Sequence, residues 1–250
     1  MPTRRILLEV AIASLGDALT AEANGADRLE LNAAMSLGGL TPSLGLLQEV
    51  KRRVKLPVMV MIRPRPGGFC YDETDFDVMC RDAELALAHG ADGLVFGLLT
   101  AEGHIDLERN RKLVNLNAGR VPVVFHRAFD LTPDPFLALE QLVELGVRRV
   151  MTSGQEETAY NGAWRISSLI DEADERIEVL PAGGINRFNI ADVLMRTGCE
   201  QVHCGLRGKQ RDPSASCKPG VSFGTAIKSP EDIFDATDPC AVRELRGLMD

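Results

Sequence analysis

This chain of 250 residues lacks several features that would define a function directly. Its six cysteines contain no C-x-x-C pair, so a zinc ribbon and a thioredoxin-type site are not supported. No apolar run approaches the ~20 residues that cross a bilayer, and the apolar segment near the start is interrupted by Glu9, unlike a signal peptide. Basic residues are outnumbered, with 28 Lys and Arg against 36 Asp and Glu, which gives a net charge of −8. We therefore expect a cytoplasmic protein with no nucleic-acid partner and no membrane partner.

Motifs for common cofactors are missing as well. No G-x-G-x-x-G turn follows the first predicted strand, which argues against an open dinucleotide-binding sheet. There is no H-E-x-x-H motif, and no spacing of two histidines and a carboxylate of the kind that binds non-haem iron. The cysteines, at 70, 80, 199, 204, 217 and 240, are expected to be reduced thiols that mostly pack in the core.

What the chain does contain is a fourfold pattern of helix end, glycine and strand. It occurs in NGADRLEL (24–31), HGADGLVF (89–96), LGVRRVMT (145–152) and TGCEQVHC (197–204). Glycine just past a helix supplies the left-handed conformation that ends it. The glycines lie at 25, 90, 146 and 198, so successive intervals are 65, 56 and 52 residues. Because one βα unit needs about 30 residues, each interval holds two units.

Four further strands are predicted in the intervals, at 6–10, 57–62, 122–126 and 177–181. Eight mostly apolar strands that alternate with helices predict an α/β fold, the (β/α)8 TIM barrel, in one domain over residues 1–250. After the last strand, 205–237 is predicted to be a long loop. A closing helix is predicted over 238–248, with Asp238 as its N-cap.

Charged side chains gather where the predicted strands end, which is the functional face of a TIM barrel. These ends carry Glu9, Glu30, Arg63, His126, Arg127, Asp130 and His203. We predict a polar catalytic site in which His126 works with Glu9 or Glu30 as general acid and base. Asp130 would orient His126 or pair with Arg127. The alternative is that the glutamates and arginines form a structural ion-pair network.

The loops after the sixth and seventh strands predict an anion-binding site. Paired glycines let the backbone approach an anion closely, and the loops after strands 7 and 8 bind phosphate in many TIM barrels. The predicted ligand-binding residues are Arg63, Arg127, Thr152, Ser153, Gly183 and Gly184. The alternative for the glycine pair is a tight turn. Strand alternation also leaves open whether His126 or Arg127 points into the barrel.

Several motifs together resemble the CutC family. They are GGLTPSLG, IRPRPGGFCY, FHRAFD, MTSG and the glutamates Glu9 and Glu30, and the resemblance runs from about Leu8 to Gly205. It implies a cytoplasmic TIM barrel linked to copper homeostasis, Cu(I) binding as in some members, and assembly into homodimers or larger homo-oligomers. The nearest available copper ligands in this sequence would be His126, His203, Cys70 and Cys204.

This sequence departs from the family pattern at the barrel mouth. Where relatives often carry cysteine, near Glu9 and after the second-strand glutamate, it has Ala11, Ile12 and Asn32. Thiolates are natural Cu(I) ligands, whereas the remaining charged residues suit an anionic small molecule. Two functions therefore stay open. One is copper handling, and the other is an isomerase- or lyase-type enzyme that acts on a phosphorylated or carboxylated metabolite by general acid–base chemistry.

Overall fold

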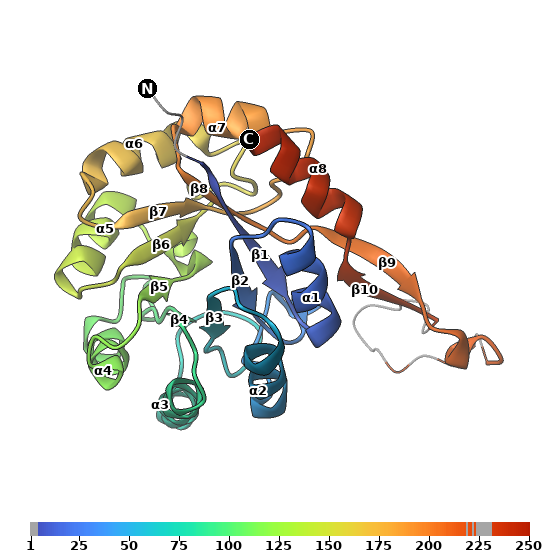
Figure 1. The fold of residues 1–250 in the computed structure, drawn as a ribbon. Helices are drawn as coiled ribbons and strands as arrows, with labels where there is room; N and C mark the ends of the chain where they lie inside the picture. Colours follow the sequence, from blue (N-terminus) through green and yellow to red (C-terminus); the bar gives the residue numbers. More distant parts are fainter. Residues whose placement is uncertain (1–4, 219, 222, 224–231) are drawn as a thin grey trace.

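The computed structural model describes residues 5–218, 220–221, 223 and 232–250. Eight parallel strands lie side by side in the order β7-β6-β5-β4-β3-β2-β1-β8 and curl into a nearly closed barrel, with the helices outside (Figure 1). The strands are β1 (Leu7–Ile12), β2 (Arg28–Leu31), β3 (Val58–Met61), β4 (Gly93–Phe96), β5 (Val123–Phe125), β6 (Arg149–Thr152), β7 (Glu178–Pro181) and β8 (Gln201–Cys204). The predicted TIM barrel is thus confirmed.

In the described part of the chain, eight α-helices alternate with the strands and cover the barrel. They are α1 (Leu15–Ala23), α2 (Leu44–Arg53), α3 (Glu73–Ala88), α4 (Leu107–Asn117), α5 (Pro135–Glu144), α6 (Ala163–Ala173), α7 (Ile190–Thr197) and α8 (Pro239–Met249). Short polar residues begin most of them: the side chains of Ser14 and Ser43, for example, accept hydrogen bonds from first-turn N–H groups. No helix among the described residues has the length and apolar character that crossing a membrane requires.

The seam between β7 and β8 is the weakest part of the barrel. Other neighbouring strands share two to four paired positions, whereas β7 and β8 meet through a single bridge between Ala182 and His203. Just beyond this bridge the two strands lead into the loops that begin at Gly183 and Gly205. The chain is therefore least tied together where those loops border the barrel mouth.

The interior of the barrel has an apolar side and a polar side. Met59, Met61, Val95 and Val124 from β3, β4 and β5 form one buried apolar cluster. On β8, β1 and β2, five inward-facing residues are instead polar and buried or nearly so: Gln201, His203, Glu9, Arg28 and Glu30. Since side chains of a strand alternate between faces, this two-residue period brings all five polar groups to the inside.

Residues 205–237, predicted as a loop, contain an antiparallel ribbon. In the described part, β9 (Arg207–Arg211) pairs with β10 (Ile233–Thr237), and the ribbon extends away from the barrel in Figure 1. Residues 219, 222 and 224–231 of the predicted loop lie outside the described residues. The base of the ribbon is fixed to α1, because the Thr237 N–H donates to Asp17 Oδ1 at 2.6 Å. The closing helix forms as α8, with Asp238 as its N-cap.

Candidate functional site

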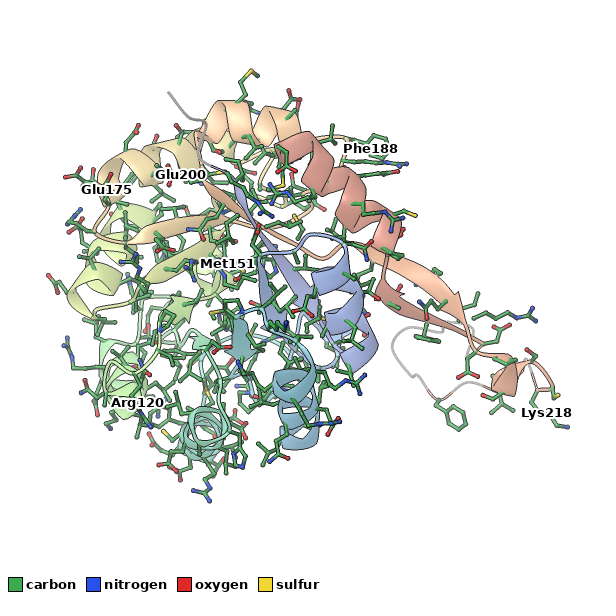
Figure 2. All side chains as sticks on the ribbon, in the orientation of Figure 1. Arg120, Met151, Glu175, Phe188, Glu200 and Lys218 are labelled. Atoms are coloured by element: carbon green, nitrogen blue, oxygen red, sulfur yellow. The ribbon has the colours of Figure 1, made fainter. Side chains whose placement is uncertain are left out.

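A cavity of about 380 Å³ opens at the C-terminal end of the barrel strands. This volume lies near the lower end of the range of about 300–1,000 Å³ for small-molecule sites. Its walls are formed by Ala11, Glu30, Asn32, Met35, Gly38, Met61, Arg63, Phe69, His126, Arg127, Met151, Ala182, Gly183, Gly184, His203 and Gly205. Met151, labelled in Figure 2, lies within the ring of strands, whereas Glu175 and Phe188 lie at the periphery. The cavity size suits a small metabolite.

A chain of two carboxylates and an imidazole forms one wall. His203 Nδ1 lies 2.8 Å from Glu9 Oε1, and its Nε2 lies 3.9 Å from Glu30 Oε2. Asn32 Nδ2 donates to the same Glu30 Oε2 at 2.7 Å, whereas the buried Glu30 Oε1 has no hydrogen-bond partner among the described residues. Burial raises the pKa of Glu30, the nearby charge of His203 opposes this, and the pKa stays above its usual value. Glu30 is therefore a buried carboxyl group in the cavity wall with one oxygen that lacks a partner among the described residues.

Glu9 has a different environment from Glu30. It lies in the middle of β1, not at its end as predicted, and forms a buried ion pair with Arg28. Burial alone would raise the pKa of Glu9, but the charge of Arg28 and the hydrogen bond with His203 outweigh it and lower the pKa to about 2. Glu9 thus stays a carboxylate. Its charge and that of Glu30 also raise the pKa of His203 above the usual value, although burial of the imidazole opposes this.

Below Glu9, the polar network continues across the barrel floor. Arg28 Nη2 and Arg149 Nε both donate to Gln201 Oε1, at 2.9 and 3.0 Å, and Arg149 Nη2 lies 2.5 Å from Glu178 Oε2. None of Arg28, Arg149, Gln201 and Glu178 lines the cavity. The predicted alternative of a structural network therefore describes Glu9 and these floor residues, whereas Glu30 faces the cavity.

His126 is a neutral donor at the opposite wall. It follows β5 as the N-cap of the 3₁₀ helix η2 (Arg127–Leu131), and the Ala128 N–H donates to its Nδ1 at 3.2 Å. Burial, helped by the charge of Arg63, lowers the pKa of His126 to about 3. An imidazole that is neutral and accepts at Nδ1 carries its proton on Nε2. That buried Nε2 has no partner in the described part of the chain.

Both His126 and Arg127 line the cavity, because neither lies within β5 and strand alternation does not apply to them. Room for the His126 ring is made by Gly97 after β4. A Cβ at Gly97 would lie 2.7 Å from His126 Nδ1, closer than atoms pack. The question that the sequence left open is thus resolved by the turn that follows the strand.

Asp130 organises the loop after β6. Its Oδ1 accepts from Thr152 Oγ1 at 2.5 Å, and its Oδ2 accepts from Arg127 Nε at 2.7 Å and from Ser153 Oγ at 2.9 Å. The Ser153 N–H donates to both oxygens, and the Gln155 N–H donates to Oδ1. With so many donors, Asp130 holds Arg127 and the loop in place and makes no contact with the His126 ring among these bonds. Of the two predicted roles, the structure shows the pairing with Arg127.

The remaining predicted ligand-binding residues play distinct parts. The Arg63 guanidinium donates to the carbonyls of Leu37, Gly39 and Gly67 at 2.8–3.0 Å, so it connects the loops after β2 and β3. Gly183, with φ of +104°, gives room to Arg127: a Cβ there would lie 3.0 Å from Arg127 Nη1. Thr152 and Ser153 are fully buried and support Arg127 from behind.

The structure does not bring the four predicted copper ligands together. Cys70 is exposed, and Cys204 is buried with a raised pKa because of its burial; neither lines the cavity. Within the described residues, one group of three or more His, Cys, Asp or Glu side chains has ligand atoms near enough to share an ion, all within 4.8 Å. It consists of Glu9, Glu30 and His203.

Sequence reasoning missed several residues of the cavity and its support. Arg28 and Gln201 on the floor, and the thioethers of Met35, Met61 and Met151 in the walls, were not predicted as site residues. The signal that finds most of them is the two-residue period. Counting back from Glu30 and His203 by two gives Arg28 and Gln201, and the same counting from Arg63 gives Met61.

These features define a TIM-barrel protein with a polar, partly buried pocket at the C-terminal mouth of its strands. The sequence profile of the CutC family matches residues 6–208. A Treponema denticola protein named as CutC family protein is 45% identical over 93% of this chain and 94% of its own length. The human copper homeostasis protein cutC homolog is 43% identical over 97% of this chain and 88% of its own. The chain belongs to the CutC family.

A solved structure agrees with this assignment. The crystal structure of the CutC protein from Streptococcus agalactiae is 34% identical, covers 79% of this chain and 97% of its own, and superimposes with a TM-score of 0.76. The resemblance seen in the sequence motifs is therefore confirmed.

Proposed function

We propose that this protein is an enzyme that moves a proton on a small carbonyl compound, a reaction of the isomerase or lyase type. One observation carries the proposal. The free Oε1 of Glu30 and the free Nε2–H of His126 are buried polar groups without partners among the described residues, and both belong to walls of the same cavity. Buried polar groups without partners are costly, and a bound substrate would satisfy both.

Glu30 is the proposed base. Its raised pKa makes its carboxylate a stronger base than an ordinary glutamate, which favours removal of a proton from carbon. His203 lies between Glu30 and Glu9, and its Nδ1–H donates to the permanently ionised Glu9. This bond fixes the imidazole orientation and supports its positive charge, so that His203 can exchange a proton with Glu30 during turnover.

His126 is the proposed electrophile. When the proton leaves carbon, the electron pair moves onto the carbonyl oxygen, where negative charge develops. A neutral imidazole donating from Nε2 stabilises that charge without being ionised beforehand. Its donor is fixed in advance by the Ala128 N–H and the close contact with Gly97, so little reorganisation is needed.

Solvent deuterium exchange tests the proposal. Dihydroxyacetone and dihydroxyacetone phosphate would be incubated with the protein in D2O, and loss of the C–H signal followed by proton NMR. We expect exchange with the wild type and a decrease of about 100-fold or more in Glu30→Gln, the range for a general base. Glu84→Gln, at an exposed glutamate, is the matched control. Wild-type exchange no faster than with Glu30→Gln overturns the proposal.

Copper binding is the second candidate, and it is favoured by the names of the relatives and by donors in the cavity wall. His126 does not offer a lone pair from Nε2, but a neutral His203 would present one, oriented by Glu9 as outer-shell carboxylates orient metal-bound histidines. The thioethers of Met61 and Met151 are soft donors of the kind that Cu(I) prefers. These residues fit the ion better than the two predicted cysteines do.

An anaerobic Cu(I) titration against a competing chelator tests this candidate. Stoichiometric binding that Met151→Leu weakens about tenfold or more, as expected on losing one ligand, would support it. Met195→Leu, at an exposed methionine of α7, is the control. Wild-type binding no tighter than that of an unrelated protein with six thiols would exclude it.

A cytoplasmic location and a homodimer or larger homo-oligomer are also proposed. All six cysteines are free, which fits a reducing compartment. Cell fractionation and light scattering of the purified protein test the two statements, and a secreted or a monomeric protein would contradict them.

A further inference from the structure

A second group of free donors borders the cavity at the loops after β7 and β8. The Arg127 guanidinium uses Nε and Nη2 for Asp130 and Ser153, but none of the hydrogen bonds found among the described residues uses its Nη1. Nη1 lies against Gly183, and both Arg127 and Gly183 line the cavity. One guanidinium nitrogen is therefore held in place with its hydrogens available to a ligand.

The backbone of the neighbouring loops adds donors of the same kind. The Gly184 carbonyl accepts from Asn186 Nδ2 and Asn189 Nδ2, both at 2.9 Å, so it is already occupied. The N–H groups of Gly184 and Gly205, in contrast, donate to no acceptor in the part of the chain that the structure describes. Both residues border this cavity and also a second, neighbouring cavity of about 530 Å³.

Charge favours an anion at this end. Among the described residues, Arg63 and Arg127 both line the cavity, against a single carboxyl group, that of Glu30. The chain as a whole carries a net charge of −8. Because the protein as a whole is acidic, this cationic pocket is a local region of positive electrostatic potential at the mouth of the barrel, and it would attract an anionic substrate there.

We propose that the substrate carries a phosphate group bound by an anion cradle, defined as Arg127 Nη1 and the N–H groups of Gly184 and Gly205. The inference rests on the proposed function, since the carbonyl end of the same molecule would lie at Glu30 and His126. A phosphate offers several acceptor oxygens to converging donors, whereas a carboxylate offers two. Backbone N–H groups and an arginine fork are the usual ligands of such a group.

Inorganic phosphate is the probe, and acetate at equal ionic strength tests whether a carboxylate binds as well. Binding is followed by amide chemical shifts in wild-type protein, which needs no variant. We expect saturable shifts centred on Gly184 and Gly205 with phosphate, and weaker binding of acetate. Arg127→Met should weaken phosphate binding about tenfold or more, the effect of losing a charged hydrogen bond. The control Arg81→Met, at an exposed arginine of α3, should not change it.

The outcomes separate this inference from the proposed function. Glu30→Gln should bind phosphate at least as tightly as the wild type, because Glu30 is not in the cradle and its loss removes a negative charge from the cavity. Exchange of dihydroxyacetone phosphate much faster than of dihydroxyacetone would support the cradle. Equal exchange of both compounds, unsaturable phosphate shifts, or preference for acetate would overturn it and leave the proton-transfer proposal standing. Phosphate binding at the cradle with no exchange of either compound would overturn the proton-transfer proposal and leave the cradle standing.

Discussion

Removing Arg28 should strongly destabilise the protein, because its partner Glu9 is sealed inside the barrel. Arg28 and Glu9 are 5% and 1% exposed, so water does not replace the lost charge. Breaking a buried ion pair from one side costs about 3–5 kcal/mol. In a chain of this size each kcal/mol lowers the melting temperature by roughly 2–4 °C, so Arg28→Met should lose about 6–20 °C. Scanning calorimetry at pH 7 measures the shift.

The same variant has a defined pH dependence. In the wild type the pKa of Glu9 is lowered to about 2 from its usual 4.5, so this group stabilises the fold above pH 4.5 and ceases to as the pH falls towards 2. Without Arg28, burial raises the pKa of Glu9, and protonation relieves the unpaired charge. The difference in free energy of unfolding between the wild type and Arg28→Met should therefore be largest near neutral pH and become smaller on acidification.

Two further variants make the reasoning refutable. Adding Glu9→Gln to Arg28→Met removes the unpaired charge and should restore part of the lost stability. Arg81→Met breaks an ion pair at the surface of α3 and should change the melting temperature by less than about 2 °C. If Arg28→Met costs no more than Arg81→Met, or if the double variant is no more stable than the single one, the floor network does not stabilise the barrel as argued.

Three other predictions concern the packing of the site. Gly97→Ala should cost about 1–3 kcal/mol of folding stability by pushing its Cβ against the His126 ring. The control Gly45→Ala, with no atom near its Cβ, should not destabilise the protein. Denaturant unfolding compares the two variants, and equal stability would contradict the contact. The His126 ring should show its Nε2–H tautomer by nitrogen NMR and titrate at about 3; a midpoint near 6.5 would exclude the neutral donor. Cys199 and Cys204, buried with raised pKa values, should react with a disulfide reagent only after unfolding. In the native protein the reagent should label the exposed thiols Cys70, Cys217 and Cys240, and rapid reaction of the two buried thiols would show that the strand ends open.

The names of the relatives and the chemistry of the cavity point to different functions for this chain. Its relatives carry copper homeostasis in their names, whereas the cavity wall offers carboxyl, imidazole, guanidinium and thioether groups and no thiol. The proton-exchange and copper experiments use the same protein and address groups that line the same cavity. A copper-loaded His203 could not exchange a proton with Glu30 through Nε2, so strong copper binding should inhibit exchange.

Sequence by itself determined the architecture of this protein. The spacing of four helix-ending glycines and the apolar strands between them were enough to predict eight βα units, because parallel strands covered on both faces leave a strong apolar signal. The family motifs were local and specific in the same way. The closing helix after Asp238 also followed from its first two residues, an N-cap and a proline.

The roles of the polar residues were decided only by tertiary structure. Glu9 and Glu30 look alike in sequence, yet Glu9 is paired with Arg28 from the next strand and with His203, 194 residues away, whereas Glu30 keeps one oxygen without a partner among the described residues. Which nitrogen of His126 carries the proton depends on the turn after β5 and on Gly97 from another strand. Periodicity within a segment records which face a side chain takes, whereas its partners, and with them its pKa and chemistry, are set by how the barrel brings distant strands together.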